Sequence, residues 1–223
     1  MIVLAIVGSV RKGGNTDLII DRILAGAKSR GAETEKIYVD DLNFGSCQGC
    51  YECRRAGVCR QKDDVAEVKA KIDAADAVVI GSPLYGNYMT GQLKLLLDRL
   101  MGIINEVRYT AGEGLKSISR LTPKKRNMVA VIGAAAPHPE AGEDAFKLLR
   151  RMLAAHANGD FYRELMVNYA NRYGQVAMGV EELKKIMAEA DIPGGEEAAR
   201  RLSTYYQKVL ADAYQLGEKM VSG

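Results

Sequence analysis

The segment IVLAIVGSVRKGGNTDLII, residues 2–20, joins a strand-length apolar run to a glycine-rich turn and then to a segment with helical periodicity. No basic segment precedes the run and no small-residue cleavage site follows it. We therefore interpret the run as a buried strand and not as a signal peptide or a membrane span. A strand, a turn and a helix in this order form the first half of a βαβ unit. The expected location is cytoplasmic, with no membrane partner.

The same succession recurs along the chain. Each apolar run of strand length is followed by a turn and a segment of helical periodicity, as in a parallel sheet buried on both faces. We predict strands at 2–7, 34–39, 77–81, 128–133 and 161–167, and helices at 16–29, 64–74, 91–104, 141–156, 180–190 and 195–221. The predicted fold class is α/β, a doubly wound sheet of five parallel strands with helices on both faces.

Length and composition agree with one domain over residues 1–223. A chain of 223 residues suits one large α/β domain, and 48% hydrophobic with 26% charged residues is ordinary for a globular protein. A net charge of +3 is too small to indicate nucleic-acid binding. Within this domain we distinguish a cysteine-rich loop at 45–63 and a C-terminal helical region at 180–221.

Some segments differ from the regular pattern. The predicted last helix has an apolar face that should close the sheet, formed by Leu202, Tyr205, Val209, Ala213, Leu216 and Met220. The segments 40–63, 105–126 and 168–179 lack clean periodicity and are predicted to be irregular. In an open parallel sheet the ligand lies outside the carboxyl ends of the strands. We therefore expect the loops 8–15, 40–63, 82–90 and 134–140 to share one edge.

The glycine-rich turn GSVRKGGNT, residues 8–16, has the properties of a phosphate-binding loop. Its glycines, Gly14 among them, allow close approach of a ligand to the backbone, and the N–H groups of the following helix point toward an anion. Arg11 supplies a charged donor, and Ser9, Asn15 and Thr16 supply polar side chains. Neither G-x-G-x-x-G nor G-x-x-x-x-G-K-[ST] matches, which disfavours a classical dinucleotide or nucleoside triphosphate site. A turn without ligand, with these side chains as helix caps, is the alternative.

A second loop, GSPLYGNYMTGQLKLLLDR at 81–99, follows the third predicted strand. Its aromatic and amide side chains, including Tyr85 and Asn87, could face a flat heterocycle, and Thr90 is interpreted as the cap of helix 91–104. A phosphate loop and a surface for a ring together indicate a mononucleotide cofactor.

All four cysteines lie in SCQGCYECRRAGVC, residues 46–59. Stable disulfides are uncommon in a reducing compartment, and structural zinc usually takes two separated pairs. Three thiols at successive two-residue gaps are typical of an iron–sulfur cluster instead, although the fourth cysteine is local and is followed by Arg60. A [4Fe–4S] cluster, zinc, a disulfide and free or redox-switching thiols all remain open.

The basic residues of this loop form either a docking patch for an acidic electron carrier or a solvated surface. Asp63 and Asp64 are interpreted as an N-cap and a dipole partner for helix 64–74, not as catalytic carboxylates.

The two glycine-containing loops with the cysteines between them resemble the NADPH-dependent FMN reductase group of flavodoxin-like proteins, and the cysteines resemble those of its iron–sulfur flavoprotein branch. The resemblance is close over about residues 1–104. It implies FMN and a [4Fe–4S] cluster as cofactors. The implied FMN-binding residues are Ser9, Arg11, Gly14, Asn15, Thr16, Pro83, Leu84, Tyr85, Gly86, Asn87, Gly133, Ala134 and Ala135, and the implied cluster ligands are Cys47, Cys50, Cys53 and Cys59.

The implied activity is that of a flavin-dependent oxidoreductase that passes electrons between the cluster and FMN. The partner would be ferredoxin, NAD(P)H or a quinone, and no catalytic side chain is required because the cofactors carry the reaction. A homodimer or homotetramer is expected, with 105–126 as a covering arm. Two alternatives are a cluster-free NAD(P)H-dependent FMN or quinone reductase and a non-enzymatic redox carrier.

Overall fold

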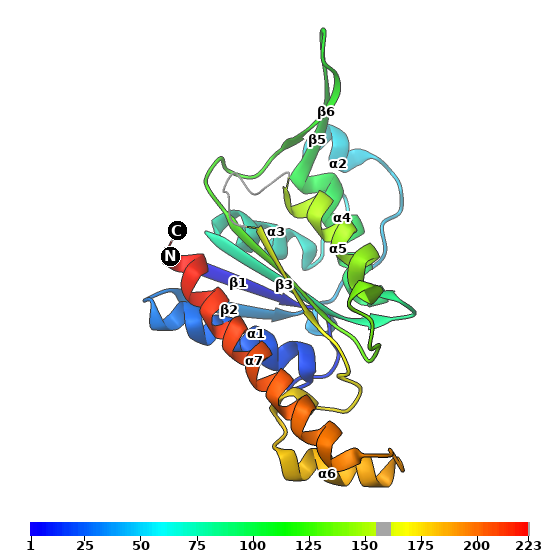
Figure 1. Ribbon diagram of the computed structural model, residues 1–223. Helices are drawn as coiled ribbons and strands as arrows, with labels where there is room; N and C mark the ends of the chain where they lie inside the picture. The colour runs from blue at the N-terminus through cyan, green and yellow to red at the C-terminus, as the bar shows by residue number, and fades with distance from the viewer. Residues whose placement is uncertain (155–161, 223) are drawn as a thin grey trace.

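Five parallel strands form the central sheet of the computed structural model, which describes residues 1–154 and 162–222 (Figure 1). Their order is β2–β1–β3–β7–β8. Their bounds are Ile2–Val7 for β1, Glu33–Tyr38 for β2, Ala77–Tyr85 for β3, Asn127–Gly133 for β7 and Tyr162–Val167 for β8. A short strand β4, Tyr88–Met89, pairs antiparallel with the end of β3. The prediction of a doubly wound, five-stranded parallel sheet is confirmed.

The strand register brings the carboxyl ends of the strands to one edge. Val7 pairs with Tyr38 of β2 and Gly81 of β3, and Gly133 pairs with Val167 of β8. The chain steps outward from β1 to β2 and then crosses back to β3, so the order reverses between β1 and β3. A crevice at such a reversal is where doubly wound sheets bind ligands.

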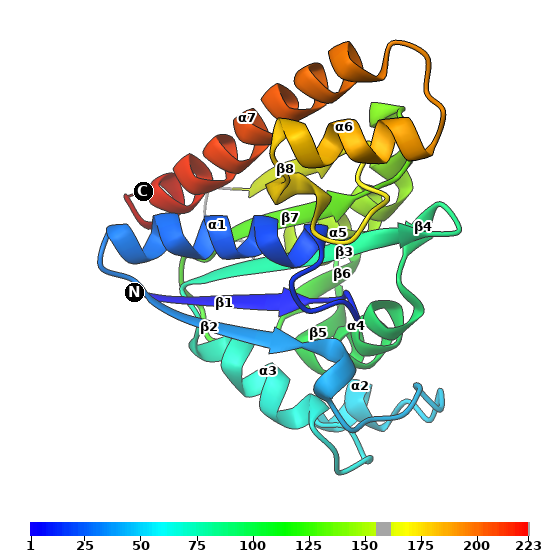
Figure 2. The ribbon, with the colours of Figure 1, turned by 90° about the horizontal axis from the view of Figure 1, so that it is seen from below.

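Helices cover both faces of the sheet (Figure 2). One face carries α1 (Asn15–Ser29), α6 (Val180–Glu189) and α7 (Gly195–Ser222), and the other carries α3 (Val65–Ala74), α4 (Gly91–Ile104) and α5 (Glu143–Ala154). Strand β1 shows why both faces are apolar: Val3, Ala5 and Val7 enter one core, while Leu4 and Ile6 enter the other. This two-sided burial explains the continuous apolar runs in the sequence.

Helix α7 packs along α1 with unusually close backbones. A Cβ on Gly26 would collide with the carbonyl of Tyr214, and a Cβ on Gly217 would collide with the carbonyl of Ile23. The buried face of α7 is Ala199, Ser203, Tyr206, Val209, Ala213, Gly217 and Met220. The predicted apolar face is therefore rotated slightly, with Leu202, Tyr205 and Leu216 half-buried at its border.

The segment 105–126 differs from the prediction of an irregular loop. Residues Asn105–Thr110 (β5) and Gly114–Ser119 (β6) form an antiparallel hairpin that projects from the body of the molecule (Figure 1). Polar and β-prone residues alternate in both strands, and Gly112 adopts a positive φ of 82° at the turn. The hairpin packs little of its surface, so its strands lack the apolar runs by which the sheet is recognised.

Smaller differences concern element ends. A 3₁₀ turn, Pro139–Gly142, precedes α5 and covers the start of the predicted helix 141–156. Residues 155 and 156 of that predicted helix, and residue 161 of the predicted strand 161–167, lie outside the described ranges. A short helix α2, Glu52–Ala56, interrupts the cysteine loop. Within residues 1–154 and 162–222, no helix combines the length and apolar character needed to cross a membrane.

Candidate functional site

A cavity of about 230 Å³ opens at the carboxyl edge of the sheet, at the reversal between β1 and β3. Four segments line it, following β1, β7 and β8 and ending β3. The lining residues are Ser9, Arg11, Gly14, Asn15, Thr16, Pro83, Leu84, Tyr85, Gly133, Ala135, Ala170, Asn171, Arg172 and Tyr173. Most of the predicted cofactor residues are therefore brought together. Gly86, Asn87 and Ala134 are the predicted residues that do not line the cavity.

The amino terminus of α1 faces this cavity without a cap. Gly14 is the N-cap residue and no side chain accepts from the first turn there. Among the described residues, the N–H groups of Asn15, Thr16 and Asp17 have no acceptor. These free donors and the positive end of the helix dipole favour an anion. A Cβ at Gly14 would lie 2.9 Å from the carbonyl oxygen of Arg11, so the turn requires glycine. This geometry fits a phosphate monoester.

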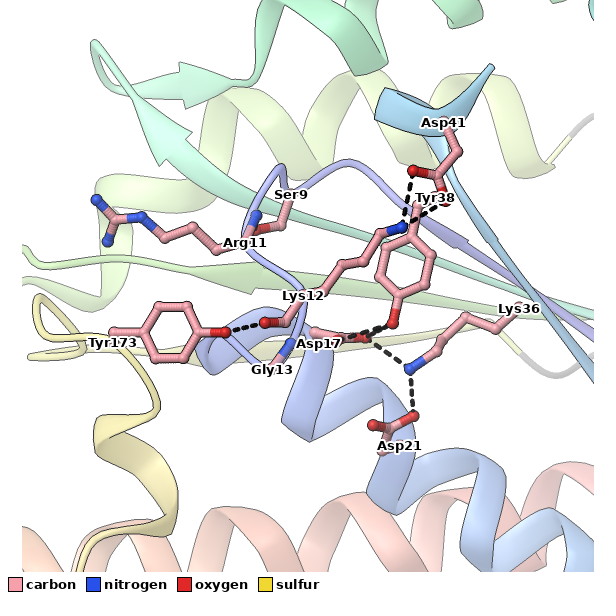
Figure 3. Close-up of polar contacts among 10 residues, drawn as sticks. All are labelled: Ser9, Arg11, Lys12, Gly13, Asp17, Asp21, Lys36, Tyr38, Asp41 and Tyr173. Atoms are coloured by element: carbon pink, nitrogen blue, oxygen red, sulfur yellow. Dashed lines mark hydrogen bonds and ion pairs between the residues drawn. The ribbon is translucent and has the colours of Figure 1, made fainter.

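A buried carboxylate holds the loop from behind (Figure 3). Asp17, 2% exposed, accepts from the N–H of Gly13 at 2.6 Å, from the hydroxyl of Tyr38 at 3.0 Å and from Lys36 Nζ at 2.8 Å. Burial lowers the pKa of Lys36, but the hydrogen bonds to Asp17 and Asp21 outweigh it and the pKa is raised overall. The ammonium therefore stays charged and balances Asp17. Gly13, at φ 76°, is thereby fixed in a conformation that few other residues adopt.

Two arginines at the cavity are available to an anion. The side chain of Arg11 extends away from the Asp17 cluster in Figure 3. Neither Arg11 nor Arg172 has a side-chain hydrogen bond or ion pair within the described part of the chain. Lys12, in contrast, is paired with Asp41 at 2.7 Å and does not line the cavity. A phosphate dianion is best matched by guanidinium groups of this kind.

The segment 168–179 forms a wall of the cavity that the sequence analysis did not identify. Asn15 Nδ2 donates to the carbonyl oxygens of Ala170 at 3.1 Å and Arg172 at 2.8 Å, and its Oδ1 accepts from the N–H of Val176 at 3.1 Å. The Tyr173 hydroxyl donates to the carbonyl oxygen of Lys12. The amide of Asn15 is therefore occupied in holding this wall. The one signal in the sequence was a polar segment directly after a predicted strand.

The second loop is more regular than predicted. Strand β3 continues to Tyr85 and turns into β4 through Gly86 and Asn87, whose φ values are 58° and 64°. The prediction that Thr90 caps α4 is confirmed, because its Oγ1 accepts from the N–H of Leu93 at 3.4 Å. The same hydroxyl donates to the carbonyl oxygen of Gly8 at 2.6 Å, which ties the two loops together. Tyr85, half-exposed, offers a ring surface at the cavity.

The cysteine loop, residues 45–63, does not line this cavity. None of its cysteines lines the cavity; the loop lies against α4 and the hairpin β5–β6 instead. A Cβ on Gly102 of α4 would collide with Cys53 Sγ, and Arg99 of α4 donates to Cys59 Sγ at 3.3 Å. The loop therefore follows the carboxyl end of β2, as expected, but its cysteines are not brought into the cavity with the other predicted site residues.

The four thiols are free, and Cys47 and Cys53 line one cavity beside α4 and the hairpin. Cys47 and Cys50 are exposed, and no hydrogen bond among the described residues holds them, whereas Cys53 and Cys59 are half-buried. No three histidine, cysteine or acidic side chains within residues 1–154 and 162–222 are grouped as a metal site. Four thiols in one short loop nevertheless form the donor set that an iron–sulfur cluster takes. Two of them are already fixed on α4.

Buried charges anchor the loop to α4. Arg99 forms two bonds of 2.9 Å to the carboxylate of Asp63 and donates to the carbonyl oxygen of Gly45 at 2.8 Å. Burial lowers the pKa of Arg99, but Asp63 and Cys59 raise it, and the net shift is upward. Asp63 and Asp64 were expected to serve as an N-cap and a dipole partner of α3. Asp64 lies at the N-cap position, but its carboxylate accepts from the N–H of Asn43, and Asp63 accepts from the N–H of Val65.

Comparison with known proteins agrees with this architecture. Residues 1–162 match the NADPH-dependent FMN reductase family. An iron–sulfur flavoprotein from Methanocaldococcus jannaschii is 40% identical over 99 residues, 44% of this chain and 51% of the relative. An iron–sulfur flavoprotein from Methanosarcina thermophila is 40% identical over 100 residues, 44% of this chain and 52% of the relative. The chain spans about half the length of the curated relatives it matches.

The solved structures agree on the fold. An azoreductase from Bacillus anthracis superposes with a TM-score of 0.63 at 15% identity, over 98% of this chain and 99% of that protein. The family match includes both predicted cofactor loops and extends to the start of β8. By this match over most of its length, the chain belongs to the NADPH-dependent FMN reductase family.

Proposed function

We propose that this protein binds FMN at the carboxyl edge of the sheet and acts as a flavin-dependent oxidoreductase. The observation that carries the proposal is the uncapped amino terminus of α1 beside Arg11, opposite the strand end Pro83–Tyr85, in one cavity. A helix terminus with an arginine suits the phosphate, and the strand end with Tyr85 suits the flat ring.

The residues divide the work of holding FMN. Arg11, Thr16 and the first N–H groups of α1 would bind the phosphate, while Pro83, Leu84 and Tyr85 would lie along the ring. Glycine at position 133 allows β7 to approach the side chain of Thr16, because a Cβ there would lie 2.9 Å from Thr16 Oγ1. Bound FMN supplies hydride or electron transfer, so the residues are needed to orient it and to limit its contact with water.

We further propose that Cys47, Cys50, Cys53 and Cys59 hold a [4Fe–4S] cluster. Support comes from the donor set, from the fixed positions of Cys53 and Cys59 on α4, and from relatives that are named iron–sulfur flavoproteins. The exposed pair, Cys47 and Cys50, would move to complete the site. A cluster exchanges single electrons, so the protein would connect a two-electron donor or quinone with a one-electron carrier such as ferredoxin.

The loop also offers a surface for such a carrier. Arg54, Arg60 and Lys62 are exposed near the cysteines, and positive charge there would attract an acidic protein. We propose that FMN and the cluster belong to one domain that assembles as a homodimer or homotetramer. The exposed side chains of Val107, Tyr109 and Leu115 lie on one face of the hairpin and would be covered in that assembly.

The test is anaerobic purification followed by measurement of flavin, iron and sulfide on one sample. About four iron and four sulfide per FMN are expected for the cluster. Flavin without iron, after reconstitution with iron and sulfide, would rule out the cluster and leave the flavin site standing. Absence of flavin, with no binding of added FMN, would contradict the proposal as a whole.

A second candidate is a cluster-free NAD(P)H-dependent FMN or quinone reductase. It is favoured by the arrangement of the cysteine loop, since no three ligands are grouped within the described residues. In such a protein NAD(P)H would bleach the visible absorption of the flavin, and the spectrum would contain no iron–sulfur absorption. The stoichiometry measured above distinguishes the two functions.

A further inference from the structure

Two arginines from outside the cysteine loop bind it, and they do so differently. Arg120, at the end of the hairpin, donates to the carbonyl oxygens of Cys53 and Arg54, both at 2.6 Å. Arg99, on α4, donates to the carbonyl oxygen of Gly45 and to both carboxylate oxygens of Asp63. Of the two, only Arg99 also donates to a cysteine sulfur, that of Cys59 at 3.3 Å.

The position of Arg99 is costly for a residue that only anchors a loop. Its side chain is 1% exposed, and Nε has no partner within the described part of the chain. Burial of a guanidinium is compensated when a carboxylate accepts both ends of the fork, as Asp63 does. Arg120 binds the loop through carbonyl contacts, pairs with Glu106 of the hairpin at 3.5 Å and is more exposed than Arg99, at 17%. The contact of Arg99 with sulfur is therefore the feature that anchoring leaves unexplained.

The contacts of Arg99 also span the whole cysteine segment. Gly45 precedes the first cysteine and Asp63 follows the last, so one buried side chain holds both ends of the loop. Cys59 lies between them and is held by the same group. In contrast, Cys47 and Cys50 lack hydrogen bonds among the described residues. Within the described part of the chain, hydrogen bonding to sulfur thus distinguishes Cys59, which Arg99 holds, from Cys47 and Cys50.

We propose that Arg99 is a positioning residue for the cluster: it presents Cys59 as a preformed ligand, and its N–H···S bond raises the reduction potential of the cluster. This inference rests on the proposed function. Hydrogen bonds to cluster sulfurs stabilise the more negative, reduced form, and outer partners of metal ligands orient those ligands. Because Arg99 lies on α4, the rigidity of this helix is transmitted to Cys59.

Arg99→Lys and Arg120→Lys form a matched pair of variants for the test. Lysine keeps the positive charge and can pair with Asp63, but its single nitrogen cannot reach Gly45, Asp63 and Cys59 in the geometry of the planar fork. Both variants and the unaltered protein are reconstituted anaerobically. Two quantities are measured: the midpoint potential of the cluster by redox titration, and the rate of iron release to a chelator. FMN content and the thermal midpoint verify folding.

Arg99→Lys is expected to make the midpoint potential more negative and to release iron about 10- to 100-fold faster. Arg120→Lys is expected to keep the potential of the unaltered protein. An unchanged potential in Arg99→Lys, or an equal shift in Arg120→Lys, would overturn the inference, because Arg99 would then act only as an anchor.

Two further outcomes are separated by the design. If the unaltered protein takes up no iron and sulfide, the proposed cluster itself fails, and this is seen before the variants are compared. If Arg99→Lys does not fold, the double variant Arg99→Gln/Asp63→Asn removes both buried charges together and leaves none unpaired. Its potential is expected to be more negative as well, and an unchanged potential would contradict the inference.

Discussion

Asn15 and Arg172 lie 157 positions apart in the chain, yet the side-chain amide of Asn15 donates to the carbonyl oxygen of Arg172 at 2.8 Å. This bond connects the first turn of α1 with the segment that follows β8. The guanidinium of Arg172 is thereby delivered to the same cavity as that of Arg11. Asn15, predicted as a phosphate ligand, has a structural reason to be present that does not involve the ligand directly.

Asn15→Ala is expected to loosen the segment 170–176. Among the described residues, the change leaves the N–H of Val176 and the carbonyl oxygen of Ala170 without partners and removes one of two donors to the carbonyl oxygen of Arg172, at a cost of about 1–3 kcal/mol. Hydrogen exchange of this segment should accelerate by about 10- to 100-fold, and FMN should bind more weakly. If FMN binding weakens while exchange is unchanged, Asn15 is a direct ligand and not a support.

Arg11→Gln and Arg172→Gln are each expected to weaken FMN binding by about 10- to 100-fold, because each removes a charge-assisted bond to the phosphate worth roughly 1.5–3 kcal/mol. Riboflavin, which lacks the phosphate, should bind with unchanged affinity. Fluorescence titration of the flavin-free protein with both flavins provides the measurement. Lys12→Gln is the control, since this ammonium is paired with Asp41 away from the cavity. Equal losses for riboflavin would show that the arginines contact the ring end instead.

Gly217→Ala is expected to destabilise the fold by about 2 kcal/mol or more, since the new methyl group would enter the backbone of α1 at Ile23. The thermal midpoint should fall by roughly 4–8 °C for a chain of this size. Gly91→Ala is the matched control, because nothing lies within 4 Å of a Cβ at that position. Similar midpoints for both variants would mean that α7 can shift away from α1 at little cost.

Acid should remove a contribution of Asp76 to stability. Burial raises the pKa of this carboxyl, but the N–H of Ile2 and the ammonium of Lys124 lower it more, so its pKa lies below the usual value in the folded protein. A group whose pKa is depressed by folding stabilises above its unfolded pKa, about 3.9, and loses this effect as pH falls through the folded pKa.

Asp76→Asn isolates this effect. The difference in unfolding free energy between the unaltered protein and the variant should be constant near neutral pH and should shrink as pH falls below about 4. Denaturant titrations between pH 6 and pH 3 provide the measurement. A difference that stays the same over this range would show that the charge of Asp76 does not contribute.

The central sheet can be predicted from the sequence because its inner strands are buried on both faces. Strands β1 and β7 are almost entirely buried, so each appears as an unbroken apolar run. The end of β3 cannot be recognised in this way, since Ser82–Tyr85 combine a serine, a proline and an exposed tyrosine. The hairpin β5–β6 cannot be predicted from apolar runs for a related reason. Its apolar side chains Val107, Tyr109 and Leu115 are exposed and do not pack into a core.

In the candidate site, too, some features can be predicted from the local sequence and others depend on contacts between distant residues. Ser9 and Arg11 directly follow a recognisable strand, so the edge on which they lie can be inferred from local sequence and parallel topology. The contact of Asn15 with Ala170 spans 155 positions, and no local pattern indicates the partner. Likewise, Cys59 accepts a hydrogen bond from Arg99, which is buried in α4. The periodicity of this helix does not predict that an arginine lies on its buried side.

The wall formed by residues 170–173 lies after the region that matches the family, which ends at residue 162. The part of the chain that matches the family therefore supplies the floor of the cavity, and residues 170–173 supply one side. Residues 170–173 are held by hydrogen bonds to Asn15 and to the carbonyl oxygen of Lys12, and they contain no strand of the sheet. Substitutions or insertions there are therefore expected to leave the sheet unchanged. Substitutions at positions 170–173 are therefore expected to change one side of the cavity while the strand end Pro83–Tyr85 keeps its position.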